Sequence, residues 1–270
     1  MPPPIALRGL LRGCCRAALV ASILACGATP PEPVRQPVTV VGIDGATWRV
    51  IDPMLARGEL PHLGRLVGDG VRAPLRSEAP LASPPIWTTL ATGVGRERHG
   101  VLGFHTGSHF ISSRDRKVPA LWILAHERGQ RSATIGWWAT FPAEPVDGVV
   151  ISERALKTRE ADLGELFFDA LPAPDAARLT HPPEALAQLG ELFAKHPPLA
   201  RDAPEPDRVE HDMEVEDTVS VEALLALRRA HGPFDLELLL LRGVDPVSHM
   251  FWRFHEPDAG AYSESVRPTA

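Results

Sequence analysis

The sequence predicts an α/β protein with an open, mostly parallel sheet and helices on both faces. Residues Val38–Ile43 (VTVVGI) form a β-branched run between Pro37 and Asp44, which is typical of a central strand buried on both faces. Residues 235–241 contain four consecutive leucines and have the same character. Helical patterns lie between these two runs, and alternating strands and helices favour a parallel sheet with its functional residues at the carboxyl ends of the strands.

The remaining elements follow from periodicity and from proline and glycine positions. Helices are expected at 50–57, 61–67, 84–92, 120–128 and 222–230, and further strands at 71–75 and 131–138. The region between Arg154 and Thr218 is richer in proline and acidic residues, and we interpret about 155–218 as a cap or insertion. Its His181, His196 and His211 lack partners at ligand spacing, so we interpret them as surface residues without a role.

Charge and cysteine content exclude several kinds of function. The chain has 28 basic and 34 acidic residues and a formal net charge of −6, which argues against a nucleic-acid-binding surface or an anionic membrane surface. Cys14, Cys15 and Cys26 all lie near the amino terminus. A disulfide scaffold or a thiolate zinc cluster is therefore not expected, and a metal site would use oxygen and imidazole ligands.

The first 25 residues have the pattern of a lipoprotein signal peptide. Arg8, Arg12 and Arg16 are followed by a nine-residue apolar run at 17–25, too short to span a bilayer. The ILAC sequence at 23–26 resembles a bacterial lipobox, so Cys26 is expected to be lipidated, with 26–37 as a tether. This predicts an exported protein anchored to a membrane and facing the periplasm or the cell surface. The alternative is an ordinary signal peptide with an incidental cysteine.

Three segments carry candidate functional residues. Asp44 follows the first strand, Ser83 is expected at the N-cap of a helix with Pro84 as the first helical residue, and Asp245 and His249 follow the leucine-rich strand at D-x-x-x-H spacing. A hydroxyl and a bound phosphate are both favoured at a helix amino terminus. Each segment has a simpler interpretation as a turn residue, a helix cap or an isolated motif. Together they gather where an α/β sheet places its site.

Six motifs together resemble the type I phosphodiesterase/nucleotide pyrophosphatase branch of the alkaline phosphatase superfamily. They are VGIDGATW at 41–48, LPHLGRL at 60–66, SPPIWTTLATG at 83–93, RHG at 98–100, GWWATFPAEP at 136–145 and DPVSHMFW at 245–252. The resemblance covers about 38–257, which we expect to form an alkaline-phosphatase-like α/β domain, followed by an irregular tail at 258–270.

The resemblance implies a hydrolase of phosphoester or pyrophosphate bonds with two divalent metal ions, most simply zinc. Asp44 would bind one metal together with Ser83, the nucleophile, and Asp245 and His249 would bind the other. Thr88 and Thr89 are expected to pack within their helix. The substrate would be a phosphorylated small molecule or a phosphodiester, and the lipid anchor would make the membrane a partner.

The sequence also departs from the family pattern. The family's D-H-G stretch and a further histidine are absent after His249, so the chain resembles the front part of a longer enzyme, incomplete at its carboxyl end. We expect little or no zinc-dependent hydrolysis by this chain, unless His99 or His105 completes the metal sites. The alternatives are a non-catalytic exported binding lipoprotein, or a sulfatase or phosphotransferase on the same fold. The metal hypothesis requires Asp44, Ser83, Asp245 and His249 to converge at one rim of the sheet.

Overall fold

The computed structural model describes residues 36–157, 176–200 and 202–255, nearly all of them in a compact unit that begins at Pro37. The predicted signal peptide, Cys26, most of the tether and the tail at 258–270 lie outside the described residues. No helix of the described chain is long and apolar enough to cross a membrane. The predicted domain boundaries remain predictions.

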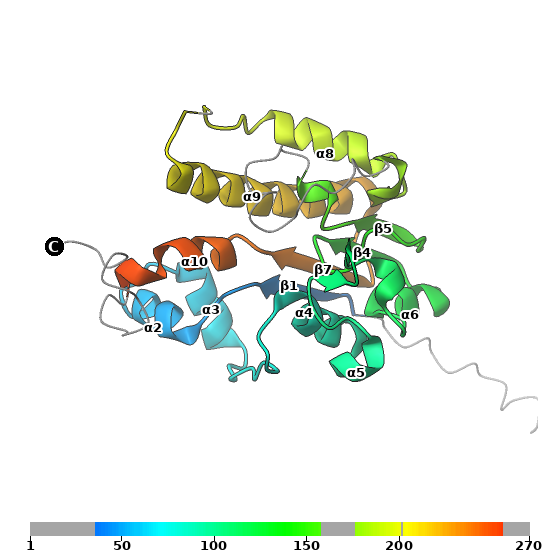
Figure 1. Cartoon of the computed structure of the whole chain (residues 1–270), viewed down its shortest axis with the longest axis horizontal. Coiled ribbons are helices and arrows are strands. Elements are labelled where there is room, and N and C mark those ends of the chain that lie inside the picture. Colours follow the sequence, from blue (N-terminus) through cyan, green and yellow to red (C-terminus); the bar gives the residue numbers. More distant parts are fainter. Residues whose placement is uncertain (1–35, 158–175, 201, 256–270) are drawn as a thin grey trace, which may run out of the picture. The chain divides into compact units, whose positions relative to one another are not determined.

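The main sheet has five strands in the order β1-β7-β4-β5-β6 (Figure 1). These are β1 (Val38–Ile43), β7 (Leu236–Leu241), β4 (Ser132–Ile135), β5 (Gly148–Ile151) and β6 (Thr180–His181). The first four are parallel and β6 is antiparallel to β5. The predicted α/β class with a mostly parallel sheet is confirmed.

The strand β1 lies at an edge of this sheet, so its predicted central position is wrong. Val38 and Val41 are 53% and 52% exposed, because β7 is the only strand among the described residues that pairs with β1. The central position belongs to β7, where Leu238, Leu239 and Leu240 are almost fully buried. Both runs read as buried strands because composition reports apolar character and not the number of neighbours.

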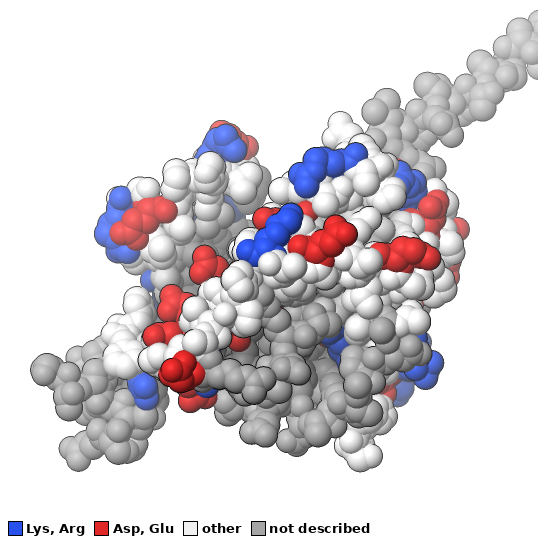
Figure 2. Space-filling view, turned by 90° about the horizontal axis from the view of Figure 1, so that it is seen from above, with Lys and Arg blue, Asp and Glu red and all other residues white. Residues whose placement is uncertain are grey.

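Helices cover both faces of the sheet (Figure 1). One face carries α4 (Ser83–Thr92), α5 (Arg96–His99) and α6 (Leu121–Glu127), and the other carries α8 (Ala185–Ala194) and α9 (Glu205–His231). Alternate residues of β7 belong to two separate hydrophobic cores, one on each face of the sheet. Leu239 packs with residues of α8 and α9, whereas Leu238 and Leu240 pack with residues of α4 and α6. On the α8 and α9 side, basic and acidic side chains lie interspersed (Figure 2).

Several elements differ from their predicted bounds. The predicted strand at 71–75 is wrong, because this segment forms neither a strand nor a helix. It is held through Arg72, which pairs with Asp52 at 2.8 Å and stacks on Trp48. The strand predicted at 131–138 ends at Ile135, because Gly136 turns the chain with φ +69°. Elements not predicted include α5, β5, β6, the hairpin β2 (His105–Thr106) with β3 (His109–Phe110), and the short helices η1 (Ser113–Asp115), η2 (Ala155–Lys157) and η3 (Ala176–Arg178).

The helix α9 is far longer than predicted. It begins at Glu205, inside the region interpreted as a cap, and continues to His231. Its early turns carry many carboxylates, which is why the sequence of this stretch indicates a cap or insertion and not a helix packed on the sheet. Several of its buried residues, including Val215 and Val219, nevertheless pack on the sheet. The helices α2 (Trp48–Ala56) and α3 (Pro61–Asp69) are close to the predicted 50–57 and 61–67. The helix α10 (Val244–His255) carries the D-x-x-x-H motif and was not among the predicted helices.

Candidate active site

Asp44 lies where two neighbouring parallel strands end. Its backbone N–H donates to the carbonyl of Leu241, the last residue of β7, at 2.9 Å. The next residue, Gly45, has φ +75°, a conformation that glycine adopts without steric cost. The chain therefore turns directly after Asp44, which leaves this carboxylate at the carboxyl-terminal rim of the sheet.

Asp245 reaches the same rim from α10. An ideal Cβ on Gly45 would lie only 2.7 Å from the Cα of Asp245, so the loops after β1 and β7 touch. Burial raises the pKa of Asp245, and the nearby Asp44 carboxylate raises it further, whereas His249 lowers it. The two carboxylates are thus close enough to repel each other, as expected of a site that binds a cation.

His249 lies one helical turn after Asp245 and faces it. Its Nε2 is 3.6 Å from Oδ2 of Asp245, so the imidazole and carboxylate of the D-x-x-x-H motif point to one place, as its spacing predicts. The imidazole is 67% exposed. It is therefore accessible to a ligand from the solvent side of the rim.

Ser83 is the first residue of α4, and not its N-cap as predicted. Ala82 is the N-cap, with extended backbone (φ −150°, ψ 131°), and its carbonyl accepts from the N–H of Ile86. No side chain caps this helix, so the Ser83 hydroxyl has no capping role. The expected row of free backbone N–H donors is also absent, because Pro84 and Pro85 follow and have no N–H.

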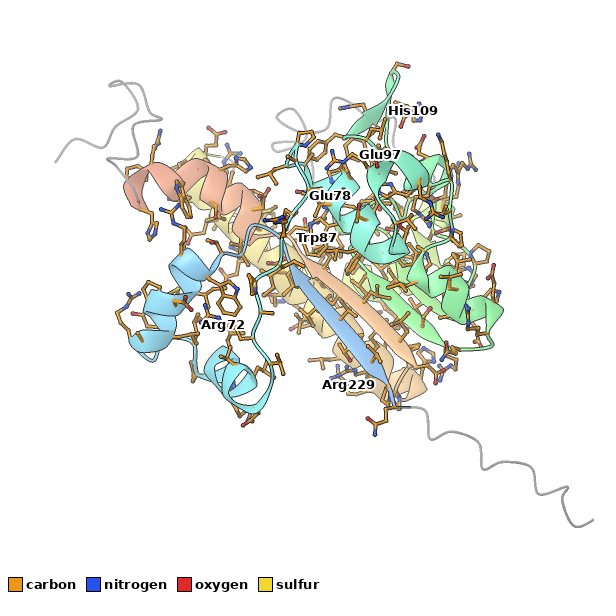
Figure 3. All side chains as sticks on the ribbon, turned by 90° about the horizontal axis from the view of Figure 1, so that it is seen from below. Arg72, Glu78, Trp87, Glu97, His109 and Arg229 are labelled. Atoms are coloured by element: carbon orange, nitrogen blue, oxygen red, sulfur yellow. The ribbon has the colours of Figure 1, made fainter. Side chains whose placement is uncertain are left out.

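The start of α4 is held at the same end of the sheet through Trp87, one turn after Ser83. An ideal Cβ on Gly42 would lie 2.5 Å from the Trp87 ring, and the indole of Trp137 donates to the Trp87 carbonyl at 2.9 Å. Gly42 precedes Asp44 by two residues, and Figure 3 shows Trp87 beside the ends of β1 and β7. Asp44 and Asp245 are close enough for their charges to interact, and His249 faces Asp245. Ser83 lies one helical turn before Trp87.

The hydroxyls of Thr88 and Thr89 have structural partners. Thr88 Oγ1 donates to the carbonyl of Pro84 at 2.7 Å, and Thr89 Oγ1 lies 3.0 Å from Nε2 of His99. The Nδ1 atom of His99 accepts from the N–H of Val101, so the proton is on Nε2 and points to Thr89. Burial lowers the pKa of His99. This buried histidine is a packing residue, and His105 lies on the exposed hairpin β2.

Two further carboxylates lie behind the rim, and sequence reasoning missed them. Asp217 of α9 accepts from the backbone N–H groups of Arg242 and Gly243 at 2.9 and 3.1 Å, and Glu216 pairs with the Arg242 guanidinium. Burial raises the pKa of Asp217 to about 6. Sequence periodicity gives no signal for this contact, because consecutive acids on a helix look solvated. The position of Arg242 and Gly243 directly after a buried strand was the usable signal.

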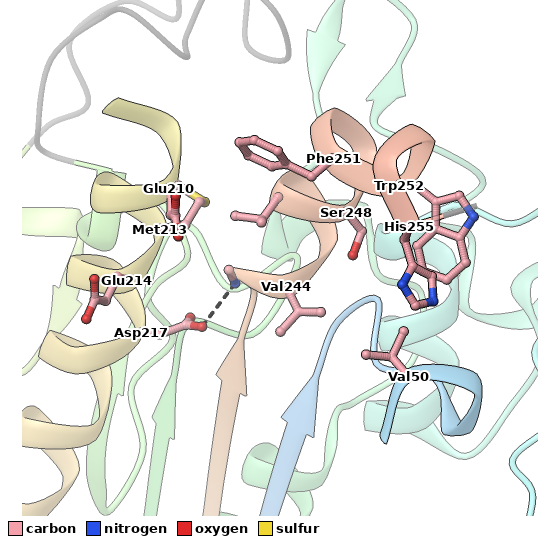
Figure 4. Close-up of a pocket in the computed structure, with 12 residues that line it drawn as sticks. Val50, Glu210, Met213, Glu214, Asp217, Val244, Ser248, Phe251, Trp252 and His255 are labelled. Carbon is pink, nitrogen blue, oxygen red and sulfur yellow. Dashed lines mark hydrogen bonds between the residues drawn. The ribbon is translucent and has the colours of Figure 1, made fainter. Parts of the chain in front are cut away.

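A cavity of about 460 Å³ opens between α9 and α10 beside this contact (Figure 4). Its lining includes Asp217, Val244, Phe251 and Trp252. Asp245 and His249 do not line it. The cavity is therefore separate from the rim that carries the candidate ligands.

Comparison with known protein families shows to which family this chain belongs. The profile of the type I phosphodiesterase / nucleotide pyrophosphatase family matches residues 38–266. The chain belongs to this family.

Solved structures similar to this family member include two crystal structures of phosphonoacetate hydrolase from Sinorhizobium meliloti 1021. The complex with phosphonoformate is 18% identical with a TM-score of 0.48, and the complex with phosphonoacetate is 19% identical with a TM-score of 0.47. Each match covers 78% of this chain and 47% of the other. The chain thus spans about half the length of these structures.

The ligand types at the rim of this phosphodiesterase-family chain fit a divalent metal, but their number does not complete a site. Asp44, Asp245 and His249 offer carboxylate oxygens and an imidazole, which zinc binds. Among the residues that the structure describes, no group of three or more His, Cys, Asp or Glu side chains is close enough to hold an ion. The rim therefore has the chemistry of part of a metal centre.

Proposed function

We propose that this protein hydrolyses phosphoester or pyrophosphate bonds, with the Ser83 hydroxyl as nucleophile. The contact between the loops after β1 and β7 carries the proposal, because it brings Asp44 and Asp245 together at the rim beside His249. Repelling carboxylates at the carboxyl end of a parallel sheet suit a cation and an anionic substrate. Membership of the type I phosphodiesterase / nucleotide pyrophosphatase family supports the same reaction class.

We further propose that the rim binds divalent metal, zinc in particular, with two ions in the complete centre. Asp44 and Ser83 would hold one ion, and Asp245 and His249 the other. Bound metal would lower the pKa of a hydroxyl and neutralise phosphoryl oxygens. The described residues supply only part of this ligand set, so we expect weak zinc binding and slow turnover.

The start of α4 and the carboxylate rim would have different roles in balancing charge during the reaction. Ser83 at the start of α4 lies in the positive end of the helix dipole, which favours an oxyanion. Because Pro84 and Pro85 lack an N–H, the first turn of α4 offers few backbone donors for phosphoryl oxygens. We therefore infer that substrate charge is balanced mainly at the carboxylate rim by bound cations.

Zinc titration by calorimetry tests the ligand assignment. Asp44→Asn and His249→Ala should each weaken binding by about 10-fold or more, since even loss of outer-shell partners costs 10- to 100-fold. His109→Ala is the matched control, because His109 is also an exposed histidine but lies on the β2-β3 hairpin. A wild-type chain that binds no zinc would overturn the metal assignment and favour the alternative of a non-catalytic binding protein.

Hydrolysis of an aryl phosphodiester in the presence of zinc tests the nucleophile. Turnover should disappear in Ser83→Ala, persist in part in Ser83→Thr, and be unchanged in Ser77→Ala. Zinc-dependent turnover that survives Ser83→Ala would show that another group attacks. Faster turnover of an aryl sulfate in the same assay would favour the sulfatase alternative.

We also propose that the protein is exported and anchored to a membrane through lipidated Cys26, facing the periplasm or the cell surface. The support is the signal-peptide pattern of residues 1–25 and the ILAC sequence. Labelled palmitate should enter the wild type and Cys14→Ala but not Cys26→Ala. Labelling of Cys26→Ala, or none in the wild type, would contradict the anchor.

A further inference from the structure

The helix α9 binds the segment that leads from β7 into α10 through hydrogen bonds and an ion pair. Consecutive carboxylates make this contact. Asp217 accepts from the backbone N–H groups of Arg242 and Gly243, and Figure 4 shows the bond to Gly243. Glu216 binds the Arg242 side chain. Arg242 is only 4% exposed. Its guanidinium also donates to the carbonyl of Glu153 at 3.3 Å. The segment is therefore fixed at both its backbone and its side chain.

Gly243 allows the segment to lie close to α9. An ideal Cβ at Gly243 would lie 2.6 Å from Oδ2 of Asp217 and 3.1 Å from the carbonyl oxygen of Met213. Any larger residue would displace the Asp217 carboxylate and crowd the carbonyl of Met213. The contact thus depends on a particular short separation between α9 and the loop.

The packing of α9 does not require buried carboxylates at this point. Val215, Val219 and Leu224 already belong to the apolar core under α9, and β7 is paired on both sides, with β1 and β4. Buried ionic groups are often no more stabilising than apolar ones of similar size. What the carboxylate of Asp217 adds is a defined position for two consecutive backbone amides.

Those amides immediately precede the candidate ligands. Asp245 is in the first turn of α10, and its own N–H donates to the carbonyl of Arg242 at 3.3 Å. On its other side Asp245 contacts Gly45, the neighbour of Asp44. The start of α10 is therefore contacted on one side by α9 and on the other side by the loop after β1.

We propose that Asp217 is a positioning residue that holds Asp245 and His249 against Asp44 through the Arg242–Gly243 backbone. It touches neither substrate nor metal. The inference rests on the proposed function for its chemical consequence, but the positional part concerns this chain's backbone alone. Glu214 provides the matched control, because it is an acid on the same helix whose side chain is exposed to solvent.

Hydrogen exchange in the 270-residue protein without metal tests the positional part. In Asp217→Asn the amides of Asp44 and Asp245, neither of which bonds to Asp217, should exchange at least about tenfold faster, as expected when a loop opens locally. In Glu214→Gln they should exchange at nearly the wild-type rate. Unchanged exchange in Asp217→Asn, or equal acceleration in both variants, would overturn the proposal.

Zinc calorimetry then tests the consequence. Asp217→Asn should weaken zinc binding about 10- to 100-fold, as loss of an outer-shell partner does, while Glu214→Gln should stay within about threefold of the wild type. Gly243→Ala should behave like Asp217→Asn. If the wild type binds no zinc, the proposed function fails while the exchange experiment still decides the positioning. Zinc affinity unchanged in Asp217→Asn and Gly243→Ala would refute the role toward the ligands.

Discussion

Gly45 lies directly against Asp245, with room for no side chain between them: an ideal Cβ on Gly45 would be 2.7 Å from the Asp245 Cα and 3.0 Å from its nitrogen. The rim therefore depends on a glycine that bears no ligand atom. Gly45→Ala should separate the two loops and reduce both stability and zinc affinity.

Gly58→Ala is a close control for this change. Both glycines have φ +75°, but nothing lies within 4 Å of an ideal Cβ on Gly58. The backbone strain of a left-handed alanine, about 1 kcal/mol, should therefore appear in both variants. Overpacking should add about 1–3 kcal/mol in Gly45→Ala only. Urea unfolding measures the free energies, and equal losses would show that the loops tolerate separation.

The fold class could be predicted because the β-branched and leucine-rich runs both indicate strands and helical patterns lie between them, although only the leucine-rich run is buried. The order of the strands could not, since the sequence of β1 does not say how many strands pair with it. The candidate rim was predictable for a similar reason: Asp44 and Asp245 follow strands, and parallel strands end together. The contributions of Gly45, Asp217 and Gly243 depend on close approach in three dimensions, which no local pattern encodes.

Substitutions of His99 and His249 should distinguish a structural histidine from a metal-binding one. Its Nδ1 accepts from Val101 and its Nε2 faces Thr89, with the ring fully buried. His99→Ala should cost about 2–4 kcal/mol of unfolding free energy, through lost packing and two unsatisfied partners, and leave zinc affinity unchanged. His249→Ala, at an exposed ring, should do the reverse. Loss of zinc binding in a folded His99→Ala variant would make His99 a ligand.

The pair Arg228–Glu237 tests how α9 is fastened to the sheet. Glu237 is 1% exposed on β7, and Arg228 Nε donates to it at 2.7 Å, which lowers the pKa of the carboxyl. Arg228→Ala leaves this carboxylate with Thr39 as its remaining side-chain partner. We expect a loss of about 1–3 kcal/mol at pH 7, moderated because Arg228 is partly exposed.

The pH dependence of this loss has a defined sign. A carboxyl with a lowered folded pKa contributes stability above its unfolded pKa of about 4.3, and this contribution disappears as the pH falls. The difference between wild type and Arg228→Ala should therefore shrink below about pH 4. Arg229→Ala, at the next residue of α9 (Figure 3), should change stability by less than about 0.5 kcal/mol. A loss that is the same at every pH would exclude the ion pair as its cause.

The contribution of the Asp217 carboxyl to stability should change with pH in the opposite direction to that of Glu237. Burial raises its folded pKa to about 6, and the adjacent Glu216 raises it too, while the N–H groups of Arg242 and Gly243 and the Arg242 charge oppose the shift. An unfolded aspartate has a pKa of about 3.9. Between these two values the folded chain holds a proton that the unfolded chain releases, so this carboxyl's contribution to stability falls as the pH rises from about 4 to about 6.

The neutral variant Asp217→Asn removes this titration. Relative to the variant, the wild type should therefore lose about 2 kcal/mol between pH 4 and pH 7, less than the full shift implies because Asp217 is only partly buried. Urea unfolding of both proteins at pH 4, 5, 6 and 7 measures the difference, and comparison with the variant removes the common contribution of Glu237 and other carboxylates. A wild type that instead gains stability relative to the variant as the pH rises would mean that the two backbone N–H groups outweigh burial, and that the carboxylate is the preferred form in the folded chain.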